Sequence, residues 1–179
     1  LLHVAQVAHT IRDAKQYGLE THMLSPDLQK VNQHISRVVA SLERQESQEM
    51  QNIFLNLGGQ ILYGQAKFSD ASTIQLGNHS IKARKFVIAT GSRSALPSIK
   101  GLDEVGYISN DTVFSQTQVP QELVILGGKS SAIEFAQAFA RLGSKVTMIV
   151  LGDSILPDED PELVNTLKEL LIREGIDFY

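Results

Sequence analysis

The chain of 179 residues contains no cysteine. It can therefore form no disulfide and no thiolate metal site, and it can perform no thiol chemistry of its own. Its five histidines, at positions 3, 9, 22, 34 and 79, show none of the spacings that metal ligands adopt. We expect no metal site, and we interpret the histidines as ordinary surface or core residues.

Clusters of basic residues and long apolar runs are also lacking. The net charge is −4, which argues against nucleic acid and anionic membranes as partners. No apolar run approaches the roughly 18 residues that a membrane-spanning helix needs, and no signal peptide is evident. We expect a cytoplasmic, globular protein that binds neither nucleic acid nor membranes.

The most informative stretch is Glu122–Val150, which combines an apolar strand, a glycine turn, a helix that ends at Gly143 and a second apolar strand. In such a unit the pyrophosphate of a dinucleotide lies at the N-terminus of the helix. Gly127, Lys129 and Ala132 occupy the three positions of the G-x-G-x-x-G pattern. A glycine turn of this kind also occurs in α/β proteins that bind nothing there, so this alternative stays open.

Other elements are predicted from periodicity and capping residues. The first is a helix from Leu1 to about Gly18, and the second a helix to about Gly58 with Ser25 as its N-cap and Pro26 and Asp27 in its first turn. An antiparallel meander of Ile61–Tyr63, Ala66–Phe68, Thr73–Leu76 and Ser80–Lys82 follows, and then a buried strand, Lys85–Thr90. A domain junction is predicted at Val119-Pro120, and a last helix is capped by Asp160-Pro161-Glu162, with Leu163, Leu167 and Leu170 on its apolar face. The chain ends in Ile176–Tyr179, which reads as a strand just begun.

The second helix carries an apolar stripe from Leu28 to Leu57. We interpret this stripe as core, with a contact between subunits as the alternative.

Three further segments carry a resemblance to a known family. They are Gly64–Phe68, the ATGS segment Ala89–Ser92 with the following Pro97-x-Ile99-x-Gly101, and Ala136–Thr147. With them, the chain resembles the pyridine nucleotide-disulfide oxidoreductases of class I, in particular the branch of mercuric reductase and dihydrolipoamide dehydrogenase.

This resemblance implies an α/β fold of the FAD/NAD(P)-binding, Rossmann-like three-layer type, with a small antiparallel meander. Residues 1–119 would be part of an FAD-binding domain, and residues 120–179 the first half of an NAD(P)-binding domain. The family's first glycine fingerprint, its redox cysteines and its C-terminal interface domain are missing. We therefore expect the chain to be the middle of a longer enzyme, truncated at both ends, that forms a homodimer through that absent C-terminal domain.

The function implied by the resemblance is transfer of a hydride from NAD(P)H to FAD. The electrons then pass to a redox disulfide and on to a disulfide or metal-ion substrate. Two alternatives stay open: a flavoprotein of the same fold without the redox disulfide, resembling a transhydrogenase or oxidase, and a degenerate, non-enzymatic binding module.

The resemblance also implies site residues. For FAD these are Ala66, Thr90, Gly91 and Ser92; for NAD(P) they are Gly127, Gly128, Lys129, Ser130, Ser131, Ala132, Glu134 and Val150. Glu134 is the expected catalytic residue, because it lies where the family keeps a glutamate that pairs with a lysine beside the flavin. A solvated helix glutamate is the alternative interpretation.

The choice between NAD and NADP depends on the residue at the end of the second strand of the Glu122–Val150 unit. An acidic residue there would take the ribose 2′-hydroxyl of NAD, and nearby arginines would take the 2′-phosphate of NADP. Val150 and Leu151 supply neither group, and the stem of Lys129 obstructs the close approach of the pyrophosphate. We predict weak and poorly discriminated nicotinamide binding, with a modest preference for NADPH.

Overall fold

The computed structural model describes residues 1–22 and 25–179. They form two compact units, one of Leu1–Arg37 with Thr112–Tyr179 and one of Val38–Asp111. The expected boundary near residue 119 between a flavin and a nicotinamide domain stays a prediction, because it concerns which cofactor each part binds. Within the described residues, no helix combines the length and the apolar character needed to cross a membrane.

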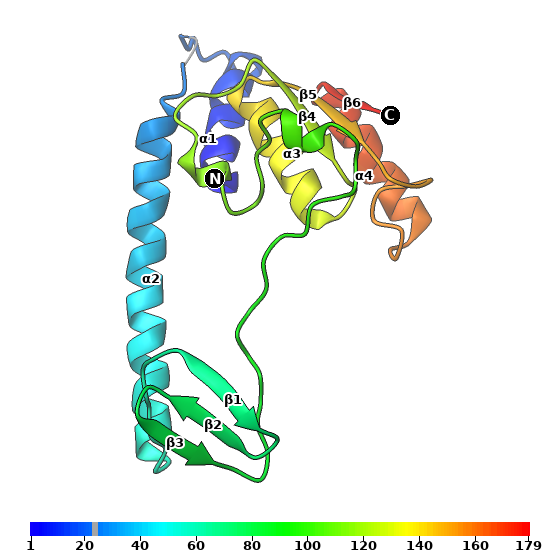
Figure 1. Ribbon diagram of the computed structural model, residues 1–179. Helices are drawn as coiled ribbons and strands as arrows, with labels where there is room; N and C mark the ends of the chain where they lie inside the picture. The colour runs from blue at the N-terminus through cyan, green and yellow to red at the C-terminus, as the bar shows by residue number, and fades with distance from the viewer. Residues whose placement is uncertain (23–24) are drawn as a thin grey trace. The chain divides into compact units, whose positions relative to one another are not determined.

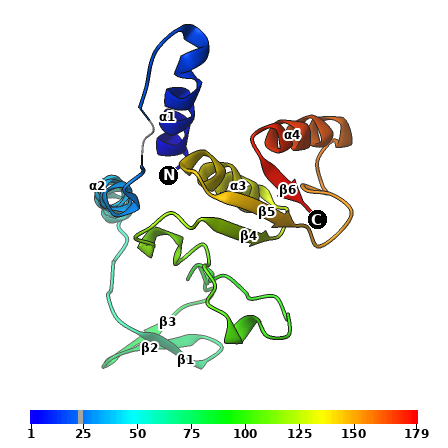
Figure 2. The same cartoon turned by 90° about the horizontal axis from the view of Figure 1, so that it is seen from above.

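The first unit contains a parallel sheet with the order β4-β5-β6 (Figures 1 and 2). Its elements are β4 (Glu122–Leu126), α3 (Ser130–Leu142), β5 (Lys145–Ile149), α4 (Pro161–Arg173) and β6 (Ile176–Phe178). Both crossovers step in the same direction, so right-handed connections place α3 and α4 on one face of the sheet. This confirms the predicted α/β fold, including the short terminal strand.

Helix α3 forms because its apolar residues recur on one face and a glycine ends it. Ile133, Ala136 and Phe139 are buried against the sheet. Gly143 adopts the left-handed conformation, and its N–H donates to the carbonyls of Phe139 and Ala140. The opposite face of the sheet exposes apolar side chains, including 57% of Val124.

Helix α4 has the predicted cap but a different apolar face. The Asp160 carboxylate accepts the N–H groups of Glu162 and Leu163, and proline occupies the first turn. However, Val164 and Leu171 are buried, whereas Leu163 is 70% exposed. The prediction of a face through Leu163 and Leu170 was therefore wrong. Apolar residues at helical spacing fit both faces, and packing on the sheet selects the one with Val164 and Leu171.

Helix α1 (Leu2–Asp13) continues as a 3-10 turn, Ala14–Tyr17, and ends at left-handed Gly18, as predicted. It lies along α3 (Figure 1). Ala5 of α1 and Ala138 of α3 are each only 1% exposed. Their small side chains let the two helices approach closely.

A charged network joins α1, α3 and the end of α4. The Arg141 guanidinium donates two hydrogen bonds of 2.7 Å to the carboxylate of Glu174 and one of 2.6 Å to Oε1 of Gln6. Gln137 donates a further bond of 2.9 Å to Glu174. Helix α1 is thereby tied to α3 and α4, which lie more than 100 positions further along the chain.

Helix α2 (Leu28–Asn56) begins in the first unit and continues in the second. Its cap is Asp27, whose side chain accepts the N–H of Lys30, so the prediction of Ser25 as the cap was two residues early. The stripe predicted as core is buried at Leu28, but Leu42 is 52% exposed and Leu57 is 82% exposed. Beyond its first turns, α2 therefore presents apolar side chains to solvent in this structure.

The second unit contains the predicted antiparallel meander of β1 (Ala66–Asp70), β2 (Thr73–Leu76) and β3 (His79–Lys82). Its first turn is closed by Asp70, whose carboxylate accepts the N–H and hydroxyl of Ser72. The remaining predicted strand, Ile61–Tyr63, which precedes these three in the chain, is not part of the sheet.

The segment Lys85–Thr90 was predicted as a buried strand, and this was wrong. It has no regular secondary structure, and Val87 and Ile88 are 91% and 74% exposed. Its composition favours burial in a parallel sheet, but burial also requires neighbouring strands. Among the described strands, none pairs with it.

Candidate nucleotide-binding edge

The edge is built around the turn that leaves β4. Gly127 has φ of +122°, a conformation that side-chain-bearing residues rarely adopt. Its N–H donates to the carbonyl of Ile149 over 2.8 Å, which extends the pairing of β4 with β5 by one residue. The turn therefore needs glycine here for its backbone conformation, as the fingerprint implies.

Gly128 is favoured for a different reason, the lack of space for a side chain. A Cβ placed on it would lie 3.1 Å from both the Cα of Ile155 and a γ-methyl of Val150. The carbonyl of Gly128 also accepts the N–H of Leu156 over 2.9 Å. The segment that follows β5 is thus folded directly onto the glycine turn.

The N-terminus of α3 opens from this turn. Lys129 is the N-cap residue, with extended backbone and no capping hydrogen bond from its side chain. Ser130 and Ser131 follow it and are exposed, and Ala132 is half-buried. The first N–H groups of a helix have no partner within the helix and form the positive end of its dipole. This geometry suits an anionic group such as a pyrophosphate.

The end of β5 presents apolar side chains to the same edge. Val150 donates its N–H to the carbonyl of Tyr179, and its side chain lies against Gly128. Leu151 is 71% exposed. The structure therefore places no acidic selector directly after β5.

Glu134 lies away from this edge, on the stripe of α3 that faces α1. It lines a groove of about 320 Å³ together with His3 and Gln6 of α1 and with Gln137 and Arg141 of α3. Glu134, Gln137 and Arg141 share this face because they are three, four and seven positions apart. Glu134 is exposed, and the groove that it lines includes Leu2 and His3 in the first turn of α1.

The residues expected to bind FAD lie in the second unit. Ala66 is the first residue of β1 and is exposed. Thr90, Gly91 and Ser92 are exposed in an irregular segment, with Gly91 in the left-handed region. An edge-to-face contact of the rings of Phe68 and Phe86, with centroids 5.1 Å apart, links β1 to the segment just before Thr90.

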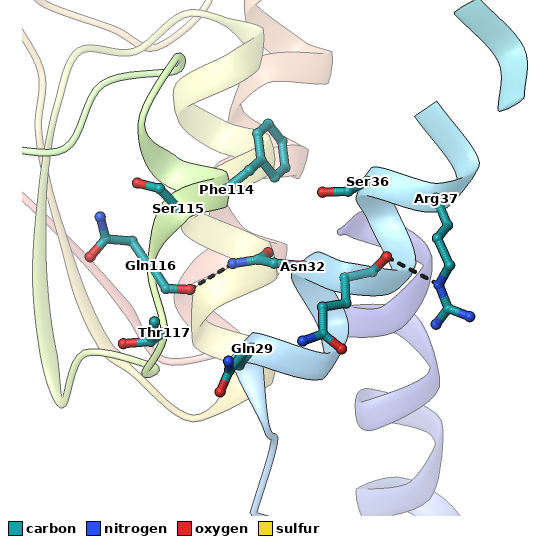
Figure 3. Close-up of a pocket in the computed structure, with 9 residues that line it drawn as sticks. Gln29, Asn32, Ser36, Arg37, Phe114, Ser115, Gln116 and Thr117 are labelled. Carbon is teal, nitrogen blue, oxygen red and sulfur yellow. Dashed lines mark hydrogen bonds between the residues drawn. The ribbon is translucent and has the colours of Figure 1, made fainter. Parts of the chain in front are cut away.

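A further groove contains none of the predicted residues. It has a volume of about 490 Å³ and lies between the first turns of α2 and residues 114–117 (Figure 3). Buried Asn32 crosses it and donates a hydrogen bond of 2.6 Å to the carbonyl of Gln116. This bond fixes the start of α2. No sequence signal announces it, because it joins a side chain to a backbone group far away in the chain.

The described residues contain no group of three or more histidine, cysteine or acidic side chains that could hold a metal ion.

A parallel βαβ unit whose glycine turn opens a helix is the unit from which Rossmann-like α/β folds are built. The sequence profile of the pyridine nucleotide-disulphide oxidoreductases matches residues 3–179. The chain belongs to this family.

Individual relatives agree with this assignment. The chain is 29% identical to a mercuric reductase of Lysinibacillus sphaericus, an alignment that covers 98% of this chain and 32% of the relative. It is 32% identical to a dihydrolipoyl dehydrogenase of Bacillus subtilis (strain 168), over 99% of this chain and 40% of the relative. Among solved structures, it is similar to the HOCl-induced flavoprotein disulfide reductase RclA from Escherichia coli, with a TM-score of 0.72, 26% identity, and coverage of 98% of this chain and 38% of that one. The chain thus spans about a third of the length of its relatives.

Proposed function

We propose that the protein to which this chain belongs transfers a hydride from NAD(P)H to FAD. From FAD the electrons pass to a redox disulfide outside this chain and then to a disulfide or metal-ion substrate. Family membership supports the class of reaction. The observation that carries the proposal is the glycine turn opening α3, combined with a carboxylate, Glu134, on the face of α3 that meets α1. The full-length protein would be a homodimer formed through a C-terminal domain.

The nicotinamide coenzyme would bind along the edge described above. The N–H groups at the start of α3, from Lys129 to Ala132, would hold its pyrophosphate. Gly127 and Gly128 keep the backbone accessible, whereas the stem of exposed Lys129 would obstruct the approach of the pyrophosphate more than its charge would favour it. FAD would contact Ala66 and the segment Thr90–Ser92. The cofactors supply the redox chemistry, and these residues supply binding and orientation.

In this proposal, Glu134 would organise the flavin side of the site. Glu134 lines a groove together with residues in the first turns of α1. Its carboxylate would hold a cationic side chain beside the flavin, which orients the ring for hydride transfer. Arg141 does not compete for Glu134, because it is bound to Glu174 and Gln6.

Glu134→Gln in the full-length enzyme tests this role. The substitution keeps size and polarity but removes the charge, so flavin reduction by NAD(P)H should slow by about tenfold or more, equivalent to about 1.4 kcal/mol. The FAD content should stay the same. Stopped-flow absorbance of the flavin measures the rate, and Glu169→Gln, an exposed position on α4, is the matched control. An unchanged rate would leave Glu134 a solvated surface residue.

Two other functions remain distinguishable. A flavoprotein of the same fold without a redox disulfide would lack two cysteines five positions apart in the sequence preceding Leu1. A non-enzymatic binding module would purify without the yellow colour of a bound flavin. The first is decided by the upstream gene sequence and the second by an absorbance spectrum of the full-length protein.

A further inference from the structure

The segment Val150–Leu156, between β5 and α4, closes onto the glycine turn at Gly128. We propose that this contact, which we term the buckle and define by Gly128, Ile155 and Leu156, positions the backbone N–H of Lys129 for the coenzyme's pyrophosphate. Leu156 and Ile155 would then be positioning residues, which act on coenzyme binding through the peptide group between Gly128 and Lys129. The inference rests on the proposed function for its ligand.

The hydrogen bond of the buckle fixes one peptide group. The N–H of Leu156 donates to the carbonyl of Gly128 over 2.9 Å. The described residues contain no cis peptide bond, and in a trans peptide the C=O and the following N–H point in opposite directions. Because the Gly128 carbonyl points toward Leu156, the N–H of Lys129 points away from the segment Val150–Leu156.

The packing of Ile155 in the core also stabilises this contact. Ile155 is only 1% exposed and belongs to the core of the first unit. Its Cα lies 3.1 Å from the position that a Cβ on Gly128 would take. Gly127, in contrast, has nothing within 4 Å of such a Cβ. Gly127 thus allows the backbone conformation of the turn, and Gly128 allows Ile155 and Leu156 to approach the turn closely.

The backbone of Leu156 is strained in this contact. Its φ is +45°, and no other non-glycine residue in the described parts of the chain has a positive φ. The conformation is unfavourable for a leucine and persists only where the surroundings impose it. Here the N–H of Leu156 is held by Gly128, and its carbonyl accepts the N–H of Glu159 over 3.0 Å. The strain indicates that the segment is fixed rather than free to adapt.

A fixed donor lowers the entropic cost of binding an anion, because the turn need not be ordered by the ligand. The pyrophosphate is remote from the nicotinamide that reacts. Loosening the buckle should therefore weaken coenzyme binding more than it slows the chemical step.

A graded series at Gly128 tests the proposal in the full-length flavoenzyme. Gly128→Ala forces the neighbours to move by a few tenths of an ångström, and Gly128→Val forces a larger shift. Gly106→Ala and Gly106→Val are the controls, because a Cβ on Gly106 meets nothing within 4 Å and its φ is not left-handed. Two readouts are needed: the KM for NADPH and NADH, and hydrogen exchange of the Leu156 amide.

We expect the KM to rise about threefold with Gly128→Ala and at least tenfold with Gly128→Val, with a smaller change in kcat. Exchange at the Leu156 amide should accelerate in the same order, while the Gly106 series changes neither readout. Unchanged exchange at Leu156 would overturn the proposal, and so would accelerated exchange with an unchanged KM. If Gly128→Val does not fold, Ile155→Val, which removes one methyl group from the anchor, is judged by the same two criteria. If the unsubstituted enzyme shows no flavin reduction by either coenzyme, the proposed function fails, and the amide exchange still tests whether the buckle exists.

Discussion

The network of Arg141 and Glu174 gives the sharpest prediction about stability. The side chains are 15% and 18% exposed, and two hydrogen bonds of 2.7 Å join them in a bidentate geometry. Hydrogen bonds to charged groups contribute about 1.5–3 kcal/mol, and removal of one partner leaves the other charge half-buried and unpaired. Because some solvent reaches the pair, we expect Glu174→Ala to lower the free energy of unfolding by about 2–3 kcal/mol, below the cost for a fully buried pair.

Thermal unfolding followed by circular dichroism measures this effect. For a domain of this size, about 1 kcal/mol corresponds to a change in Tm of about 2–4 °C, so Glu174→Ala should lower Tm by about 4–12 °C. The control is the pair of Lys145 and Glu122, which lie 3.6 Å apart with 68% and 78% of their side chains exposed. Glu122→Gln should change the stability by less than about 0.5 kcal/mol.

The pH dependence supplies a second, independent test. Burial raises the pKa of the Glu174 carboxyl, but hydrogen bonds from Arg141 and Gln137 outweigh it, so the pKa lies below its ordinary value of 4.5. A carboxyl whose pKa is lowered on folding stabilises the folded state above its unfolded pKa and loses this contribution as the pH falls through the folded pKa. The stability difference between the unsubstituted protein and Glu174→Gln should be full above pH 4.5 and shrink below it. The reasoning would be refuted if the unsubstituted protein and Glu174→Gln had equal Tm values at neutral pH, or if their difference in stability persisted undiminished in acid.

Two further predictions concern the coenzyme and a helix cap. Because neither Val150 nor Leu151 selects between the coenzymes, steady-state kinetics of the full-length enzyme should show less than about tenfold discrimination, equivalent to about 1.4 kcal/mol, with a modest preference for NADPH. A low-micromolar KM for NADH with a larger preference for it would contradict this, and Lys129→Gly combined with Val150→Glu should improve NADH use. Asp160→Ala removes the acceptor for two N–H groups at the start of α4 and should cost about 1 kcal/mol in denaturant unfolding, whereas Asp158→Ala, at an exposed neighbouring position, should cost little.

Features set by neighbouring residues were predictable from the sequence. The cap at Asp160 and the glycine that ends α3 follow from local chemistry, and both are confirmed. The buried face of α4 was not predictable, because Leu167 belongs to both candidate faces and only packing on the sheet separates them. The prediction that Lys85–Thr90 forms a buried strand was wrong for a related reason, because an apolar strand is buried only where other strands flank it.

The same distinction applies to the candidate site. The positions Gly127–Ala132 could be read as a nucleotide turn because their signal is a local pattern of small residues. The contact of Leu156 with Gly128 could not, because it is made by two backbone groups and any side chain supplies the same N–H and C=O. The bond between Arg141 and Glu174 spans 33 positions and depends on where α4 ends. Long-range polar pairs of this kind leave no periodic trace in a sequence.

The packing of α1 on α3 also has a consequence for folding during synthesis, because α1 is made long before α3. Gln6 and Arg141, which join the two helices, are 135 positions apart. At about 5–20 residues per second, α1 leaves the ribosome about 7–27 s before its partner exists. The strands and helices between Glu122 and Phe178 are contiguous and can assemble as they emerge, but α1 must wait with its apolar side uncovered. Among the helices of the first unit, α1 therefore offers a chaperone the longest time to act before its partner helix is made.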